Sequence, residues 1–242
     1  MTDFQDRSPV LGEEIPFTQI ERTGVQKYGS DMILAEHQLE ILVNGRREAI
    51  LSCTPSYLAE LAAGYLITEG IAADLSEIEQ IEMSEQETQA RIRLRSGGSR
   101  NSSPAGTVTP VFWKPEWIFA LADRLREGMP LHRMTKAAHS CFLAGGDELL
   151  FQCEDIGRHN AMDKAVGYAL RNGINLQKCI LYTSGRVPAE IARKAIAARI
   201  PVLVSKASPT ALAVRIAKDA HLTLICAARS DSMRVYCDYS AR

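Results

Sequence analysis

The sequence lacks an excess of charge of either sign. Its 28 lysine and arginine residues nearly balance 29 aspartate and glutamate residues, and the formal net charge is −1. A protein without a strong positive field is not expected to bind nucleic acid or acidic lipid through charge alone. Any site for an anion must therefore be built locally, from a few side chains held close together.

Long apolar runs are also missing. No window approaches the length of about eighteen apolar residues that a membrane helix needs, and the residues that follow Met1 are acidic rather than basic and then apolar. The six cysteines are scattered without any C-x-x-C spacing, which indicates reduced thiols. We therefore expect a cytoplasmic protein with neither a membrane span nor a secretion signal.

Several catalytic motifs are absent as well. The sequence contains no H-E-x-x-H, P-loop or G-x-S-x-G motif. It also lacks the H-x-E and P-C-x-x-C motifs with which zinc deaminases hold their metal. These absences predict that no metal ion belongs to the protein's own site.

What is present is typical of a folded globular protein. Hydrophobic residues make up 46% of the 242 residues and charged residues 24%. This length allows one large domain or two modest ones. Residues 96–109 are rich in Ser and Gly and have few apolar groups, which favours a mobile loop at a domain junction. We predict a strand-rich α+β domain over 1–108 and an α/β domain over 109–242.

The N-terminal part reads as strands with one helix. Asn44 and Gly45 supply the positive φ angles of a tight turn, so they predict a hairpin of residues 39–43 and 49–51. Residues 90–94 alternate between apolar residues and arginine, the period of a strand with one exposed face. The intervening apolar pattern at helical spacing predicts a helix.

Two pairs that end in proline indicate helix starts. Thr54-Pro55 is predicted to cap the N-terminal helix, which ends at Gly70. Ser208-Pro209 is predicted to be an N-cap followed by a proline at the first helical position.

The C-terminal half contains a second predicted hairpin and then alternates strands with helices. This alternation is the signature of an α/β layer with parallel strand pairing. The predicted hairpin is 139–143 with 149–153, and the later strands are 179–182, 200–204, 222–226 and 233–236.

Polar loops follow these predicted strands. In an open α/β sheet, ligands bind beyond the carboxyl ends of the strands, where helix N-termini carry partial positive charge. Loops with arginine, lysine and hydroxyl side chains at these ends fit a phosphate or diphosphate, although solvated loops with ordinary caps are the alternative. The loops are 154–160, 183–186, 205–208 and 229–232.

The densest group of functional side chains lies in residues 154–164. His159 and Asp163 are four residues apart and would share a helix face, so the carboxylate could hold the imidazole in one tautomer for acid–base work. That arrangement leaves open an enzyme that acts on phosphate esters. The alternative is a capping network in which Asp155 and Asn160 satisfy the first amides of the helix.

His139 and Cys141 are two residues apart on a predicted strand and therefore share a face. An imidazole beside a thiol could lower its pKa and create a nucleophile. Packing is the alternative, because cysteine is often a small core hydrophobe and Leu143 continues the same face.

The run from Glu154 to Lys164 reads E-D-I-G-R-H-N-A-M-D-K and resembles the signature of formate dehydrogenase accessory proteins, the FdhD family. The similarity extends over most of the chain and is weak only in the first forty residues. Further matching segments are 54–55, 61–70, 183–186, 201–206 and 212–214.

The resemblance implies a fold and an activity. The fold is a cytidine-deaminase-like α/β domain, with a mixed sheet and helices on both faces, behind a smaller strand-rich N-terminal domain, usually in a homodimer. The activity is that of a sulfurtransferase. Such a carrier takes sulfur from a cysteine desulfurase and passes it to the molybdenum bis(molybdopterin guanine dinucleotide) cofactor before that cofactor enters formate dehydrogenase.

The resemblance also gives the polar loops a ligand, because a guanine dinucleotide carries diphosphates. Residues 227–232 match by position the family's nucleotide-contacting loop, although most of them differ from its usual pattern. The expected cofactor-binding residues are Asp155, Gly157, Arg158, Asn160, Ser184, Arg186, Ser205, Lys206, Ala227, Ala228, Arg229, Ser230, Asp231 and Ser232.

The sequence departs from the family where the sulfur would be carried. Members that transfer sulfur have a C-x-x-C pair in the loop before the central domain, whereas this chain has S-S-P-A-G at 102–106. A hydroxyl cannot hold a persulfide, since the carrier step needs a thiolate. Either Cys141 substitutes, with His139 as general base, or the protein binds the cofactor without carrying sulfur.

Overall fold

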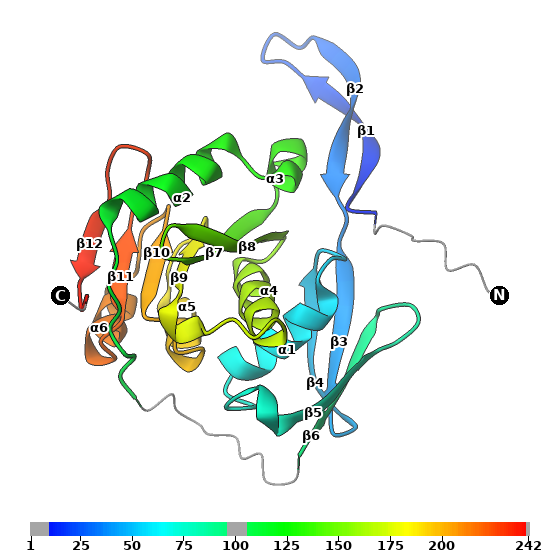
Figure 1. Ribbon diagram of the computed structural model, residues 1–242. Coiled ribbons are helices and arrows are strands. Elements are labelled where there is room, and N and C mark those ends of the chain that lie inside the picture. Colours follow the sequence, from blue (N-terminus) through cyan, green and yellow to red (C-terminus); the bar gives the residue numbers. More distant parts are fainter. Residues whose placement is uncertain (1–9, 96–105, 241–242) are drawn as a thin grey trace.

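The computed structural model describes residues 10–95 and 106–240 (Figure 1). The described residues form a six-stranded sheet, a four-stranded sheet and a two-stranded hairpin, with helices between and around them. Within these ranges, none of the helices has the length and apolar character needed to cross a membrane. Most of the predicted Ser/Gly loop, residues 96–105, lies outside the described residues.

The first part of the chain supplies the two smaller sheets. Strands β1 and β2 pair only with each other, and the other four strands form a sheet in the order β4-β3-β6-β5. The elements are β1 (Gly12–Ile20), β2 (Gln26–Leu34), β3 (His37–Val43), β4 (Arg46–Cys53), α1 (Leu58–Thr68), η1 (Leu75–Glu77), β5 (Ile78–Met83) and β6 (Gln89–Leu94).

The second part supplies the six-stranded sheet, in the order β12-β11-β10-β9-β7-β8. Its elements are α2 (Pro115–Glu127), α3 (Pro130–Thr135), β7 (His139–Gly145), β8 (Glu148–Asp155), α4 (Arg158–Arg171), η2 (Leu176–Lys178), β9 (Ile180–Thr183), α5 (Ala189–Ala197), β10 (Val202–Ser205), α6 (Ala211–Asp219), β11 (Thr223–Cys226) and β12 (Arg234–Cys237).

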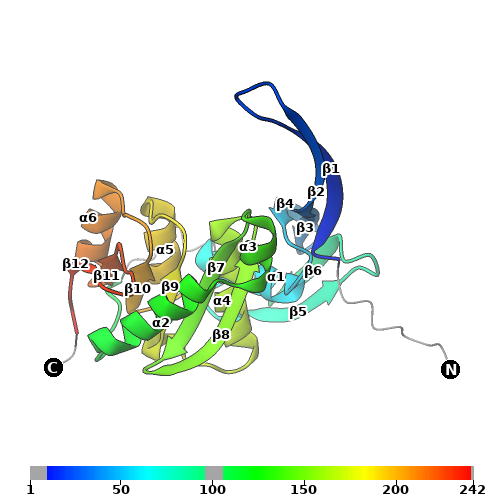
Figure 2. The ribbon, with the colours of Figure 1, turned by 90° about the horizontal axis from the view of Figure 1, so that it is seen from above.

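The six-stranded sheet is mixed and is covered on both faces, as predicted. Strands β9, β10 and β11 are parallel, whereas β7 and β12 run antiparallel to their neighbours. Because side chains alternate along a strand, Phe142, Tyr182 and Val204 pack on one face with α2. Leu181 and Leu203 pack on the other face, which α4, α5 and α6 cover (Figure 2).

Helices α1 and α4 are in unusually close contact, and glycine makes this approach possible. A Cβ atom at Gly64 would lie 1.8 Å from the carbonyl oxygen of Asp163, and one at Gly167 would lie 1.8 Å from the carbonyl oxygen of Glu60. Figure 1 shows α1 between α4 and the four-stranded sheet. A single apolar core therefore extends from the four-stranded sheet through both helices to the six-stranded sheet.

The predicted hairpins are confirmed. Residues 39–43 and 49–51 lie in β3 and β4, and the turn residues Asn44 and Gly45 have φ angles of 50° and 77°. The hairpin of 139–143 and 149–153 is β7 with β8. The period-two pattern of residues 90–94 corresponds to β6.

The predicted cap at Thr54-Pro55 is wrong. Helix α1 begins only at Leu58, after Tyr57 in the left-handed region with a φ of 53°. Thr54 is fully buried, and its backbone N–H donates to a carboxylate oxygen of Asp155 over 3.0 Å. Its hydroxyl donates to the same carboxylate over 3.1 Å, so the side chain binds a segment about a hundred residues away, which no local pattern reveals.

The predicted cap at Ser208-Pro209 is also wrong. Thr210 caps α6, because its side chain accepts a hydrogen bond from the N–H of Ala213. Ser208 and Pro209 instead lie beside Val187, whose N–H donates to the Ser208 carbonyl over 3.2 Å. The segments that follow β9 and β10 are thus hydrogen-bonded to each other before helices α5 and α6 begin.

Strands β1 and β2 were not predicted, and neither was helix α3. Figure 1 shows the β1–β2 hairpin projecting from the body of the protein. Its side chains are mostly exposed, including Ile20 at 68% and Tyr28 at 83%. A hairpin without a buried face has no alternation of apolar and polar residues for sequence analysis to detect.

Candidate functional site

The fold brings the predicted polar loops to one edge of the six-stranded sheet. Strands β9, β10 and β11 are parallel, so their carboxyl ends meet there. Strand β7 runs antiparallel to β9, which places its first residue, His139, at the same edge. His139 pairs in register with Asp155, the last residue of β8. Residues from both halves of the predicted site therefore lie close together.

A cavity of about 370 Å³ opens at this edge, and we call it the edge cavity. Four of the predicted site residues line it: His139, Ser184, Lys206 and Arg229. The remaining lining residues, which sequence analysis missed, are Leu125, Met129, His132, Lys136, Ala137, Ala138, Ser140 and Ala207.

The edge cavity combines positive charge with an apolar wall. Lys136, Lys206 and Arg229 are exposed, and among the described residues none of them has an ion-pair partner. Leu125 and Met129 supply apolar surface from the end of α2 and the residues after it. Three cations beside apolar side chains fit a ligand that has both an anionic part and a flat apolar part.

His139 faces Ser184 and not Cys141. Its Nδ1 lies 3.3 Å from Oγ of Ser184, which itself accepts a hydrogen bond from the N–H of Ser140 over 3.0 Å. Burial and the nearby charge of Arg158 lower the pKa of His139 below its ordinary value of 6.5. The imidazole is therefore held neutral near pH 7, where it can donate or accept a hydrogen bond.

The expectation that His139 lowers the pKa of Cys141 is wrong. Cys141 has no exposed surface and lies opposite Cys153 in the β7–β8 register. Burial raises the pKa of the Cys141 thiol well above its ordinary value, with Cys153 adding to the shift. A buried thiol with a raised pKa is a poor nucleophile, so the packing alternative describes this residue.

The other cysteines are no better suited to carry sulfur. Burial raises the pKa of Cys53, Cys153 and Cys226 to about 12 and that of Cys179 to about 11. Cys237 is partly exposed, but its thiol donates to the carbonyl of Leu222 and burial raises its pKa too. None of the six cysteines, all of which lie in the described residues, has the features of an activated thiolate.

Asp155 lies at the centre of a buried ion pair. Its carboxylate is 2.6 Å from Nζ of Lys164, and neither side chain is exposed. The other carboxylate oxygen accepts from the N–H of Gly157 and from the amide of Asn160. Asn160 also donates to the carbonyl of Ser52 over 2.7 Å. Asp155 therefore accepts a hydrogen bond from the backbone at the start of α4, and Asn160 links this helix to the end of β4. This agrees in part with the capping alternative.

Asp163 holds a lysine and not His159. Its carboxylate lies 2.7 Å from Nζ of Lys194 and accepts a hydrogen bond from Thr68 over 2.7 Å. Lys194 completes its contacts with Glu69 at 2.8 Å. Burial raises the pKa of Asp163 although Lys194 opposes the shift. The predicted His159–Asp163 pair is thus wrong, because the Asp163 carboxylate forms an ion pair with Lys194 on α5 instead.

A second cavity, of about 350 Å³, lies between α1, α4 and α5, and we call it the helix cavity. His159 lines it, and burial together with Arg158 lowers the pKa of this imidazole. The lining residues are Leu51, Tyr65, Thr68, Glu69, His159, Asn160, Asp163, Glu190, Arg193 and Lys194. The two histidines of the predicted site therefore belong to different cavities.

Glu154 fixes the position of the helix that forms part of the edge-cavity wall. Its buried carboxylate accepts hydrogen bonds from the N–H groups of Leu131 and His132, each over 2.7 Å. These bonds hold the start of α3, which brings His132 and, just beyond the helix, Lys136 to the cavity wall. Pro130 at the first position of α3 is the one sequence signal that could have revealed this helix.

The remaining predicted loop residues do not line the edge cavity. Arg186 is exposed beyond Gly185, and the buried Ser205 hydroxyl donates to the Gly185 carbonyl over 2.6 Å. The carbonyl of Ala228 accepts from the hydroxyl of Tyr182. Ala227 adopts a positive φ of 50°, and exposed Asp231 accepts a hydrogen bond from Ser232. Ser230 is partly buried in the same loop.

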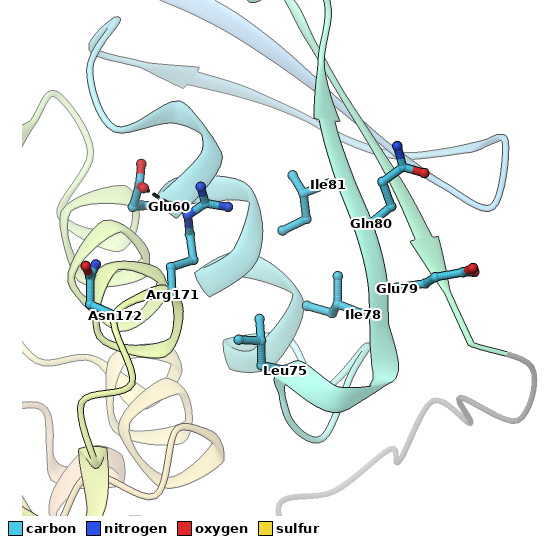
Figure 3. Close-up of a pocket in the computed structure, with 8 residues that line it drawn as sticks. All are labelled: Glu60, Leu75, Ile78, Glu79, Gln80, Ile81, Arg171 and Asn172. Carbon is cyan, nitrogen blue, oxygen red and sulfur yellow. Dashed lines mark hydrogen bonds and ion pairs between the residues drawn. The ribbon is translucent and has the colours of Figure 1, made fainter.

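The cavity drawn in Figure 3 is separate from these sites. It has a volume of about 500 Å³ and is lined by residues of α1, the end of α4 and the start of β5. Its one marked interaction is the ion pair of Arg171 with Glu60 at 3.0 Å. It contains none of the residues that the sequence singled out.

Comparison with known proteins gives consistent matches over nearly the whole chain. The model of the FdhD/NarQ family matches residues 34–109 and 99–241. A protein of Streptomyces coelicolor named sulfur carrier protein FdhD is 33% identical, with 89% of this chain and 90% of the relative covered. A Bacillus subtilis protein of the same name is 28% identical over 85% of this chain and 88% of its own length.

The fold also matches a solved structure. A crystal structure from Desulfotalea psychrophila, described as a formate dehydrogenase accessory protein, superposes with a TM-score of 0.82. The match covers 96% of this chain and 98% of the other, at 24% sequence identity. This likeness supports the mixed α/β architecture.

Proposed function

Because the chain belongs to the FdhD/NarQ family, we propose that it serves formate dehydrogenase by binding the bis(molybdopterin guanine dinucleotide) form of the molybdenum cofactor as cargo in the cytoplasm. The observation that carries this proposal is the edge cavity, where Lys136, Lys206 and Arg229, without ion-pair partners in the part of the chain that the structure describes, lie beside apolar surface. A guanine dinucleotide offers both the diphosphate and the flat ring that such a cavity would accept.

The cavity residues suggest how the cargo would be recognised. Arg229 can hold a phosphate through two parallel hydrogen bonds, and Lys206 adds a compact charge. The neutral ring of His139 and the hydroxyl of Ser184 offer a donor and an acceptor to the base or sugar. Leu125 and Met129 would cover the apolar face of the guanine.

Binding of GDP to the full chain, measured by calorimetry, tests this function. We expect saturable binding that Lys206→Gln and Arg229→Gln each weaken about tenfold, the usual size of a lost charge-assisted contact. Arg215→Gln is the matched control, because Arg215 is exposed on α6, does not line the cavity and is not among the expected cofactor-binding residues. Failure of GDP to bind, or equal losses in all three variants, would overturn the assignment.

Sulfur carrying is a second candidate function, and the names of the curated relatives favour it. In this step a thiolate of the chain would attack the terminal sulfur of a desulfurase persulfide, forming a new persulfide and releasing the desulfurase thiolate. Cys141 would be the carrier and His139 the base. The burial of Cys141 opposes this step, so the thiol would first have to become exposed.

Intact-protein mass spectrometry after incubation with a cysteine desulfurase and cysteine distinguishes the two functions. A gain of one sulfur atom that maps to Cys141 and is lost in Cys141→Ser would establish carrying. No gain, while GDP still binds, would leave a protein that holds the cofactor without transferring sulfur. The burial of the thiols leads us to expect the second result.

The proposed partners follow from the same function. They are a cysteine desulfurase, formate dehydrogenase and a second copy of this chain in a homodimer. Light scattering coupled to size-exclusion chromatography tests the homodimer, and a monomer at micromolar concentration would argue against it. Co-purification of tagged chain with each enzyme, with and without GDP, tests the other two.

A further inference from the structure

Strand β5 and the segments that flank it carry acidic side chains without basic ones. Residues 71–90 contain no lysine or arginine, but they contain the acids Asp74, Glu77, Glu79, Glu82, Glu85 and Glu87. Glu79 and Glu82 lie on β5 and are exposed, and neither forms an ion pair with another described residue. Arg91, which lies opposite Glu82 in the strand register, donates a hydrogen bond to Gln89 instead. The two acids of β5 are therefore available to a cation from outside the chain.

The backbone of β5 also has a free side. Among the described strands, β5 pairs only with β6, so it is an edge strand of the four-stranded sheet. The carbonyl of Ile92, which lies opposite Ile81, accepts a hydrogen bond from Asn44 on the side of β3. Because the bonding direction alternates along an antiparallel pair, the N–H and C=O groups of Ile81 and of Met83 point away from β6. These outward groups can pair with another strand.

The cavity drawn in Figure 3 lies along the same strand. Its volume is about 500 Å³, and Leu75, Ile78 and Ile81 give it an aliphatic wall. Figure 3 shows Ile78 and Ile81 on the side of β5 that faces α1, with Glu79 and Gln80 on the other side. Strand addition to a sheet edge uses these two features together, since the free backbone supplies hydrogen bonds and a neighbouring cavity accepts alternate side chains.

We propose that the free edge of β5 is a docking site for an extended basic segment of a partner protein, which adds to the four-stranded sheet as a further strand. Lysine or arginine side chains of that segment would lie beside Glu79 and Glu82, and an aliphatic side chain would enter the cavity of Figure 3. The site is on the four-stranded sheet, whereas the edge cavity is on the six-stranded one, so this inference does not depend on the cargo.

The acids of β5 also indicate what does not dock there. Pairing of this edge with the same edge of a second copy would bring four glutamates, Glu79 and Glu82 of each chain, close together. Like charges on adjacent strands destabilise the pairing, and charged side chains on an edge strand are a common protection against self-association. A partner strand with the opposite charge gains from the same side chains, which is why the proposed segment is basic.

Binding of labelled peptides to the full chain, measured by fluorescence anisotropy, tests the charge of the site. A peptide that alternates lysine or arginine with valine should bind saturably, and one that alternates glutamate with valine should not bind. The double variant Glu79→Gln with Glu82→Gln should weaken binding of the basic peptide by roughly tenfold. Glu116→Gln with Glu127→Gln is the matched control, because it removes two exposed acids from α2 and should change nothing.

A second measurement uses the wild-type protein and tests strand pairing itself. Two versions of the basic peptide carry N-methyl groups on alternate residues, one on the odd positions and one on the even positions. In a paired strand only every second N–H bonds to the neighbour, so one version should bind more than about tenfold more weakly and the other less than about threefold. Serine in place of valine should also weaken binding, because the aliphatic side chain for the cavity is lost.

Three results would overturn the docking site. They are no saturable binding of the basic peptide, equal affinity in the wild type and the Glu79→Gln with Glu82→Gln variant, and equal losses for the two N-methylated peptides. The last result would mean that the peptide adheres by charge alone and adds no strand. Dependence on the two acids together with unequal losses for the two N-methylated peptides would establish the site, whether or not GDP binds the edge cavity.

Discussion

The α1–α4 interface and the edge of the six-stranded sheet use the same segment, residues 154–164, in opposite ways. At the interface, the buried acids Asp155 and Asp163 are each matched by a lysine and a threonine. At the edge, Arg158 and the loop cations Lys206 and Arg229 have no acid among the described residues.

The difference separates charges that stabilise the fold from charges that are available to a ligand. A buried charge must be compensated, so a matched pair inside the protein reports on stability. A cation that the fold leaves uncompensated beside a cavity reports on a ligand. Most of this signature holds the two parts of the chain together, whereas its arginine has no ion-pair partner among the described residues.

Gly64→Ala should break the interface most severely. The added methyl group would overlap the Asp163 carbonyl oxygen, so α1 and α4 would have to separate. We expect a loss of roughly 4 kcal/mol in the free energy of unfolding, or failure to fold. Urea unfolding followed by circular dichroism measures it. Gly106→Ala, where nothing lies within 4 Å, is the control. A fully stable Gly64→Ala variant would contradict the close contact.

Lys164→Met should come next, because it leaves Asp155 buried without its cation. The expected loss is about 3 kcal/mol, and the double variant Lys164→Met with Asp155→Asn should recover part of it. The exposed pair of Arg126 and Asp123 gives the contrast, since Asp123→Asn should cost less than about 1 kcal/mol. Equal losses for the buried and exposed pairs would remove the distinction between them.

Glu154→Gln should affect both stability and ligand binding. The amide keeps one acceptor oxygen, so one N–H at the start of α3 loses its partner and the loss should be roughly 1–2 kcal/mol. Because α3 forms the cavity wall, GDP affinity should also fall, by about threefold. Glu148→Gln, on an exposed residue of β8, should change neither quantity. A stable variant with unchanged affinity would show that α3 holds its place without Glu154.

The smallest effect concerns pH. His139 and His159 have lowered pKa values in the fold, so below about 6.5 the unfolded chain binds protons that the folded chain does not. Stability should therefore fall as the pH decreases through this range. Asp163, whose pKa burial raises, acts in the opposite direction.

Urea unfolding at pH 7.5 and 5.5 separates these contributions. The double variant His139→Gln with His159→Gln should lose less stability on acidification than the wild type. If both proteins lose the same amount, the two rings titrate in the fold as they do in the unfolded chain.

Local patterns predicted the elements that have a buried face. The alternation in residues 90–94 and the Asn44-Gly45 turn each identified the correct structure. The rule that ligands bind at the carboxyl ends of parallel strands predicted that the loops of Ser184, Lys206 and Arg229 meet at one edge, and all three residues line the edge cavity. His139 also lines it, although its spacing from Cys141 had suggested a different role.

Contacts between distant segments could not be predicted in this way. His159 and Asp163 have the right spacing for a pair, but Lys194 from another helix is the stronger partner. Thr54 looks like a helix cap and is instead buried against Asp155. Local spacing states which contacts are available, and the tertiary structure decides which of them form.

The shared apolar core has a consequence for how the protein folds. The predicted boundary at residue 108 falls between two sheets, yet buried Leu39 and Ile92 of the four-stranded sheet belong to the same cluster as Leu181 and Leu203 of the six-stranded one. A chain cut at this boundary would expose the glycine face of α4 to water. The protein should therefore fold and unfold in a single cooperative transition, and neither part should be recoverable as an independent unit.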